Sequence, residues 1–343
     1  MADVLATGGA PLPPALLPGD RVAVVALSSP VPEDRLDAGL AVLRGWGLEV
    51  VEARGLRGRH PDLPYLAGSD EERAAAFMSA WTDPDVGAVL VGRGGYGVPR
   101  ILDLLDWDAL AAAGPRTLVG FSDVTPLLHA VVARLGYAAV HGPAVTGIGD
   151  GAPASRDSVR DLLLGPAGER VVADDLEVLV VGSASGPLVG GNLALLAACP
   201  GDLLPARGAV VLLEDVDESP HRLDRALTTL LRSGWLDDAA AVVLGGFTRC
   251  GDPDVVRGLL LDRLGGLGVP VVAGAPVGHD EPNVAVPIGA TAHLDGTQLR
   301  VDVARLRWGR GEGTPGEPDV PSIGSAQTSH FGTRFSHMRP RPQ

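Results

Sequence analysis

The segment Leu118-Val-Gly-Phe-Ser-Asp-Val-Thr-Pro126 joins an apolar run to the start of a helix. The apolar residues predict a strand, and Pro126 suits the first turn of a helix over 125–135, where the missing N–H has no intrahelical partner. Ser122 therefore lies at a strand–turn–helix junction, which can hold a serine hydroxyl beside free helix N–H groups. This position suits a nucleophile. The alternative is that Ser122 or Asp123 only caps the helix.

Strands and helices alternate on both sides of this segment. Apolar, β-branched runs predict strands, and helical spacing or capping signals predict helices between them. The expected strands are residues 21–27, 48–52, 86–91 and 117–121, and the expected helices are 36–43, 71–81, 99–105 and 125–135. Such alternation indicates an α/β domain over residues 17–145, in which helices cover both faces of a parallel sheet.

The chain after residue 145 has a different character. Residues 146–185 are rich in Gly, Pro, Ala and Asp and predict a connector with one short helix around 158–164. Order returns over residues 186–308, which predict a second, strand-rich domain. Its expected strands are 209–213, 240–245, 269–273 and a pair near 291–303, with one helix at 224–232. Residues 309–343 are expected to form a disordered tail because they can bury little apolar surface.

Composition excludes several classes of protein. The 343 residues carry a formal net charge of −14 and contain no lysine. Schiff-base lysines, Ser–Lys dyads and P-loop lysines are therefore excluded, and an acidic chain is poorly suited to nucleic acid or anionic membranes. Cys199 and Cys250 form no CxxC pair, which argues against a cysteine zinc site. We expect a protein with no secretory signal and no membrane span, acting in the cytoplasm.

A nucleophilic serine needs a base, and the base needs an orienting carboxylate. Of eight histidines, His279 follows a predicted strand in the loop Gly274–Asn283, where catalytic residues are usually placed. The apolar run 210–213 ends in Glu214 and Asp215, which point to opposite faces of a strand, so only one should face a cleft. His279 could instead be an ordinary loop histidine, and Glu214 and Asp215 could simply form a solvated strand end.

The glycine-rich turn Arg93-Gly-Gly-Tyr-Gly97 follows a second predicted strand of the same sheet. Ligands bind at the carboxyl ends of strands in open α/β sheets, and glycines let the backbone approach a ligand. The pattern alone is equally compatible with a tight strand-to-helix turn.

Nine short segments in order give the chain a resemblance to the LD-carboxypeptidases, a family that includes the microcin-immunity peptidases. The matching segments are Leu17–Asp20, Leu66–Arg73, Arg93–Gly97, Gly120–Asp123, His141–Pro143, Gly190–Leu193, Leu213–Val216, Arg222–Arg225 and Gly278–Asn283. The resemblance implies a flavodoxin-like first domain that carries the serine and a strand-rich second domain that supplies a glutamate and a histidine.

Carried over to these positions, the resemblance makes Ser122 the nucleophile, Glu214 the orienting acid and His279 the general base. Asp123 and Gly95 would form the oxyanion hole through their backbone N–H groups. The reaction would release terminal D-alanine from murein tetrapeptides during cell-wall recycling, with no metal or cofactor, in a homodimer.

We expect Arg93 and Asn192 to bind the substrate's carboxylate or peptide groups. Two other functions remain open. The first is an immunity-type peptidase that cleaves aminoacyl-nucleotide-like antibiotics with the same triad, although residues 146–185 contain no Trp, Tyr or Phe to stack on a base. The second is a non-catalytic ligand-binding protein.

Overall fold

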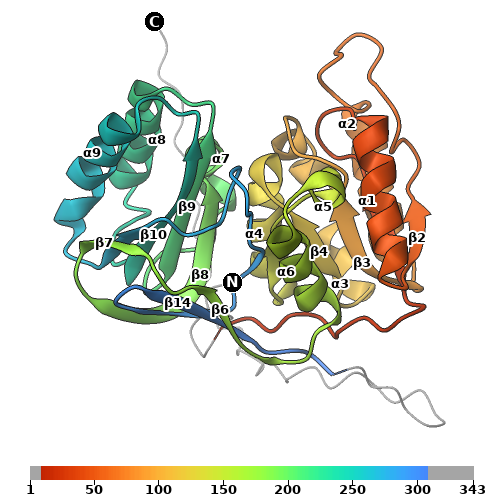
Figure 1. Ribbon diagram of the computed structural model, residues 1–343. Coiled ribbons are helices and arrows are strands. Elements are labelled where there is room, and N and C mark those ends of the chain that lie inside the picture. Colours follow the sequence, from red (N-terminus) through yellow and green to blue (C-terminus); the bar gives the residue numbers. More distant parts are fainter. Residues whose placement is uncertain (1–8, 308–343) are drawn as a thin grey trace, which may run out of the picture. The chain divides into compact units, whose positions relative to one another are not determined.

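The computed structural model describes residues 9–307, and the expected tail at 309–343 lies outside this range. The first part of the chain forms a six-stranded sheet in the order β12-β5-β4-β3-β1-β2. Figure 1 labels β2, β3 and β4 of this sheet. Its strands are β1 (Arg21–Val25), β2 (Glu49–Glu52), β3 (Val86–Val91), β4 (Thr117–Gly120), β5 (Ala139–His141) and β12 (Val286–Ile288). β1 to β5 are parallel, and their order 2-1-3-4-5 is that of flavodoxin-like sheets, as expected.

Six α-helices follow the strands of this part of the described chain. In α1, Leu36, Leu40 and Leu43 recur at helical spacing and are fully buried. The helices are α1 (Glu33–Gly45), α2 (Asp70–Thr82), α3 (Trp107–Ala112), α4 (Thr125–Leu135), α5 (Val145–Asp150) and α6 (Pro153–Leu164). The capping box before α2 is confirmed, because Ser69 and Glu72 exchange side chain–backbone hydrogen bonds. The helix expected at 99–105 is instead two short 3₁₀ turns, Val98–Arg100 and Leu102–Leu104.

The second part forms an eight-stranded sheet in the order β6-β14-β13-β8-β9-β10-β11-β7. Its strands are β6 (Gly168–Ala173), β7 (Glu177–Val180), β8 (Ser183–Asn192), β9 (Val210–Val216), β10 (Ala241–Thr248), β11 (Val271–Ala273), β13 (Thr291–Asp295) and β14 (Gln298–Val303). The central strands β8 to β11 are parallel, and the outer strands pair antiparallel. The prediction of a strand-rich second domain is confirmed.

Three helices belong to this part: α7 (Leu193–Ala198), α8 (Pro220–Arg232) and α9 (Pro253–Leu264). α8 and α9 lie side by side against the sheet (Figure 1). α8 extends the helix expected at 224–232, and α9 was not expected from the sequence. No helix within residues 9–307 is long and apolar enough to cross a bilayer.

The segment 146–185 differs from the connector expected there. It contains most of α5, all of α6, and the strands β6 and β7. β6 and β7 are the two edges of the second sheet, and α5 packs against α1 of the first part. Four of its six glycines and both prolines lie at element ends or in the short turns between elements, so the composition indicated short turns rather than an irregular segment.

The two sheets are joined through α4 and β8. The His129 ring on α4 bonds Gly190 O at 2.9 Å, and the Thr125 hydroxyl accepts from Asn192 N at 3.2 Å. These contacts hold the carboxyl end of β4 close to the carboxyl ends of β8 and β9. The arrangement places the predicted serine segment next to the predicted acid.

Candidate active site

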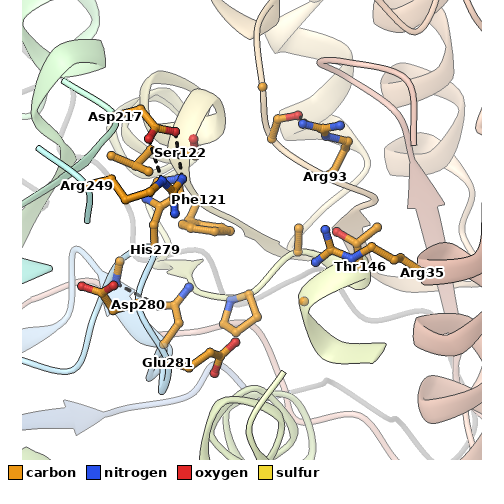
Figure 2. Close-up of a pocket in the computed structure, with 18 of the residues that line it drawn as sticks. Arg35, Arg93, Phe121, Ser122, Thr146, Asp217, Arg249, His279, Asp280 and Glu281 are labelled. Atoms are coloured by element: carbon orange, nitrogen blue, oxygen red, sulfur yellow. Dashed lines mark hydrogen bonds and ion pairs between the residues drawn. The ribbon is translucent and has the colours of Figure 1, made fainter. Parts of the chain in front are cut away.

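Ser122 occupies a strained turn between β4 and α4. Its φ angle is +61°, in a region that non-glycine residues adopt only under constraint. Ser122 opens a 3₁₀ turn (Ser122–Val124), and neither that turn nor α4 has a side-chain cap. The structure therefore contradicts the interpretation of Ser122 or Asp123 as a helix cap. Ser122 Oγ makes no hydrogen bond within residues 9–307, and the half-buried hydroxyl faces a cavity (Figure 2).

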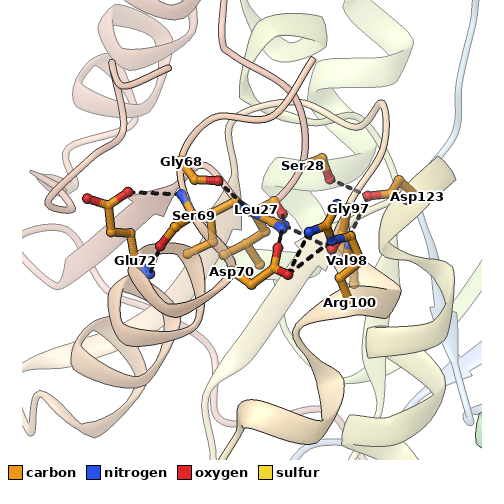
Figure 3. Close-up of polar contacts among 11 residues, drawn as sticks. Leu27, Ser28, Gly68, Ser69, Asp70, Glu72, Gly97, Val98, Arg100 and Asp123 are labelled. Atoms are coloured by element: carbon orange, nitrogen blue, oxygen red, sulfur yellow. Dashed lines mark hydrogen bonds and ion pairs between the residues drawn. The ribbon is translucent and has the colours of Figure 1, made fainter. Parts of the chain in front are cut away.

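A buried polar network holds this turn in place (Figure 3). The Asp123 carboxylate, which is 1% exposed, accepts from Ser28 Oγ at 2.6 Å and from Val98 N at 2.8 Å. The buried Arg73 guanidinium donates to the carbonyls of Leu27 and Gly97 beside it. Burial raises the pKa of Asp123. The side chain after the serine thus ties three separate loops together and stabilises the strained backbone.

The glycine turn lies directly against the serine. A Cβ atom on Gly94 would stand 3.3 Å from Ser122 Oγ, and one on Gly95 would stand 2.2 Å from Ser29 Oγ. Gly95 also has a φ angle of +126°, so no other residue fits there without displacing Ser29. Within the described part of the chain, the N–H groups of Gly95 and Asp123 donate to no backbone or side-chain acceptor. Both remain free to bind a ligand oxygen.

Glu214 and His279 form a close pair from two parts of the second sheet. Glu214 on β9 is 0% exposed, and its Oε2 accepts from His279 Nδ1 at 2.7 Å. This bond places the proton on Nδ1, so Nε2 keeps its lone pair and can act as a base. The neighbouring Asp215 points the opposite way and accepts from Asn192 Nδ2 and Ala194 N. Glu214 is therefore the acid that faces the histidine.

The pair meets the serine segment through Phe121. The Phe121 and His279 rings lie 4.7 Å apart between centroids, and Ser122 and His279 line the same cavity. The structure records no direct Ser122–His279 hydrogen bond. Catalytic hydrogen bonds in ligand-free enzymes often close only when substrate binds.

The cavity has a volume of about 440 Å³ and carries both signs of charge. Its ionisable lining side chains are Arg35, Arg93, Asp217, Arg249, His279, Asp280 and Glu281. Arg35 and Arg93 lie on one side, and Asp217, Arg249, Asp280 and Glu281 lie on the other (Figure 2). Within residues 9–307, no group of three or more His, Cys, Asp or Glu side chains is arranged to hold a metal ion.

The structure brings together most of the residues singled out from the sequence. Ser122, Gly95, His279 and Arg93 line the cavity, while Glu214 and Asp123 support it from behind. Asn192 does not line it. Asn192 is 2% exposed, caps α7 through its Oδ1 atom and donates to Asp215.

Sequence reasoning did not single out Arg35 and Arg249, because each is one exposed arginine among many until the fold places it at the cavity. The first is bound to Asp150 at 2.6 Å, and the second forms a two-pronged pair with Asp217 at 2.7 and 2.8 Å. Both guanidinium groups are therefore already neutralised by carboxylates.

Buried ionisable groups near the site predict a loss of stability in acid. Burial lowers the pKa of both His129 and His141 to about 4. In the unfolded chain these histidines take up a proton near pH 6.5, but in the folded protein only near pH 4. Each therefore contributes about 3 kcal/mol to the free energy of unfolding above pH 6.5, and this contribution is lost as pH falls toward 4. Burial raises the pKa of Asp215 to about 6, so this carboxyl is protonated more easily in the folded protein. Its protonation therefore raises the free energy of unfolding by about 3 kcal/mol over the same pH range. Urea unfolding should show a lower free energy of unfolding at pH 4 than at pH 6.5. The fall should be smaller than the two histidine contributions together, because Asp215 and the buried Asp123, whose pKa burial also raises, act in the opposite direction.

The control for this acid effect is His129→Gln, which removes one of the two buried imidazoles. Its stability at pH 6.5 should fall, while the difference between pH 6.5 and pH 4 should shrink. A wild-type protein equally stable at both pH values would contradict the prediction.

Comparison with known proteins places this site in one family. Residues 22–142 match the LD-carboxypeptidase N-terminal domain, and residues 185–294 match the LD-carboxypeptidase C-terminal domain. A putative carboxypeptidase of Streptomyces coelicolor is 51% identical over 287 residues, covering 82% of this chain and 93% of the relative. The murein tetrapeptide carboxypeptidase of Pseudomonas aeruginosa is 39% identical over 303 residues, covering 82% of this chain and 94% of the relative.

Solved structures agree with this placement. The muramoyltetrapeptide carboxypeptidase from Oxalobacter formigenes has a TM-score of 0.71 and 30% identity, covering 83% of this chain and 98% of that one. MccF in complex with glutamyl sulfamoyl guanosine has a TM-score of 0.78 at 22% identity, covering 85% of this chain and 98% of that one. At this identity the similarity supports the shared fold and nothing about function.

Proposed function

Because the chain belongs to the LD-carboxypeptidase family of serine peptidases, we propose that it releases terminal D-alanine from murein tetrapeptides in cell-wall recycling. The observation that carries the proposal is the Glu214–His279 pair, which lines one cavity with the strained, unbonded Ser122. These three side chains supply the nucleophile, base and orienting acid of a serine peptidase.

The reaction follows from the positions of these groups. His279 Nε2 takes the Ser122 proton as Oγ attacks the scissile carbonyl, and the buried Glu214 carboxylate stabilises the resulting imidazolium. The free N–H groups of Gly95 and Asp123 donate hydrogen bonds to the carbonyl oxygen and stabilise the negative charge that develops on it. His279 then protonates the leaving amine of D-alanine, and water hydrolyses the acyl-enzyme by the same route.

Arg93 is suited to bind the terminal carboxylate that defines a carboxypeptidase substrate. Its guanidinium bonds the carbonyls of Gly94 and Pro30, and it alone of the cavity arginines has no carboxylate partner in the described chain. Burial and the nearby Arg35 lower the pKa of Arg93, because both disfavour its positive charge. A substrate carboxylate would neutralise that charge in a partly dehydrated site.

Replacing Arg93 with glutamine should therefore raise KM for the tetrapeptide by about 10- to 100-fold, the scale of a lost hydrogen bond to a charged group. Initial rates should be compared for the free acid and for a tetrapeptide with an amidated C-terminus. We expect Arg93→Gln to lose most of the preference for the free acid. The matched control is Arg249→Gln, which lies at the same cavity but is already paired with Asp217. An unchanged preference in Arg93→Gln would contradict this role.

Two features argue against the other functions considered. Phe121 is the one Phe, Tyr or Trp residue among the described lining residues, and its ring packs against His279. That leaves no free aromatic surface for the base of an aminoacyl-nucleotide antibiotic. A binding protein would have no use for a strained serine with a free hydroxyl beside a Glu–His pair.

Mass spectrometry of murein tri-, tetra- and pentapeptides after incubation tests the function directly. Loss of one alanine from the tetrapeptide alone is the expected result, and cleavage of the pentapeptide or of none of them would overturn it. A parallel incubation with an aminoacyl sulfamoyl nucleoside tests the immunity-type reaction. We also propose, from the family resemblance, a cytoplasmic homodimer, which light scattering and cell fractionation can check.

A further inference from the structure

His141 is a buried histidine for which the protein supplies no hydrogen-bond partner. It is the last residue of β5, lies against Gly191 of β8 in the second sheet and is 0% exposed. Both ring nitrogens lack a partner within residues 9–307. A neutral imidazole always carries one N–H donor and one acceptor, and leaving such groups unpaired in the interior costs stability. A buried histidine in this state needs an explanation.

Glu214 presents the complementary group. Its Oε2 accepts from His279, but its Oε1 is buried and has no donor in the described chain. His141 and Glu214 are close enough to interact electrostatically, and the charge of Glu214 favours the protonated form of His141. His141 Nδ1 lies 3.2 Å from where a Cβ on Gly191 would stand, and Gly191 pairs with Leu213, the residue before Glu214. A ring donor and a carboxylate oxygen, both without partners in the described chain, thus lie where the two sheets meet.

We propose that His141 is a positioning residue that holds the second oxygen of Glu214 through one buried water molecule. The imidazole N–H donates to the water, and the water donates to Glu214 Oε1. Buried waters typically make about three hydrogen bonds to such unsatisfied groups. The link fixes the carboxylate plane so that Oε2 meets His279 Nδ1–H. This inference rests on the proposed function, in which Glu214 orients the catalytic base.

The surroundings of His141 keep it neutral and away from the substrate. The titratable groups that face it are Glu214 on β9, His279 in the loop after β11 and His129 on α4. The apolar Phe121 ring covers it edge-on at 5.9 Å between centroids. His141 does not line the cavity, so it acts only through Glu214.

His141→Phe tests the link because phenylalanine keeps the ring and removes the donor. We expect kcat/KM to fall about 10- to 100-fold, the scale of a hydrogen bond to a charged group. The donor also withdraws charge from Glu214, so removing it makes the Glu214–His279 pair more basic. The acid limb of the pH profile of kcat/KM should therefore move up by about one pH unit.

Two variants separate positioning from simple destabilisation. His141→Gln keeps an N–H donor and should restore most of the activity and the wild-type acid limb. His129→Phe removes another fully buried histidine, whose nitrogens bond Gly190 O and Leu204 N instead of Glu214. It should lower the melting temperature and leave the acid limb in place. An unshifted acid limb in folded His141→Phe would overturn the proposal.

A measurement with residue 141 intact removes any dependence on the folding of His141→Phe. In ¹⁵N-histidine-labelled protein, the His141 ring resonances should shift between wild type and Glu214→Ala, and unchanged resonances would overturn the link. The proposed function fails separately, if Ser122→Ala keeps its turnover. Activity lost in Ser122→Ala together with an unshifted His141→Phe profile would refute the positioning role alone.

Discussion

Replacing Ser122 with alanine is expected to lower kcat on a murein tetrapeptide by about 10⁶-fold, the loss typical of a deleted serine nucleophile. The Gly95 and Asp123 N–H groups and the Arg93 guanidinium remain in place, so KM should change little. Chromatographic assay of released D-alanine over long incubations measures the residual rate. Near-native turnover in Ser122→Ala would show that another group performs the attack.

Ser122→Gly separates catalysis from folding at the same position. The φ angle of +61° is strained for serine and alanine but costs glycine little, so glycine should stabilise the fold by up to about 1 kcal/mol. We expect an inactive protein with a raised melting temperature. A fluorophosphonate probe should label wild type and neither variant, and labelling of Ser122→Ala would contradict the assignment.

Local patterns were sufficient to predict four of the six strands in the first sheet. Short apolar runs separated by helical spacing gave β1 to β4 and the parallel arrangement, and the capping box at Ser69 marked the start of α2. The sequence could not show that β12 returns from residues 286–288 to pair antiparallel with β5. That pairing joins residues about 145 positions apart, and no local signal encodes it. The helix α9 was missed because Gly258 interrupts an otherwise helical apolar pattern.

The site divides in the same way between local and tertiary information. Ser122, Glu214 and His279 could be selected because each follows or ends an apolar run, and strand ends gather at one edge of a sheet. Which of Glu214 and Asp215 faces His279 depends on the strand's rotation, which the structure supplies. Asn192 also ends a strand, β8, but its side-chain amide is already bonded. Its Nδ2 donates to Asp215, and its Oδ1 accepts from Leu195 N in the first turn of α7.

His279→Ala is expected to lower kcat about as much as Ser122→Ala, by about 10⁶-fold, because hydroxyl and imidazole act as one unit. The informative test is the double variant Ser122→Ala/His279→Ala, which should be no slower than either single variant. Independent roles would instead multiply the two losses.

The matched control is His293→Ala. His293 also pairs with a carboxylate, Asp302 at 2.9 Å, but it lies on β13 and does not line the cavity. Its kcat should equal that of wild type, since a histidine–carboxylate pair has no catalytic value without a nucleophile beside it. If His293→Ala lost turnover while His279→Ala kept it, the base would lie elsewhere in the fold. Losses that multiply in the double variant would mean that Ser122 and His279 serve separate steps rather than one proton transfer.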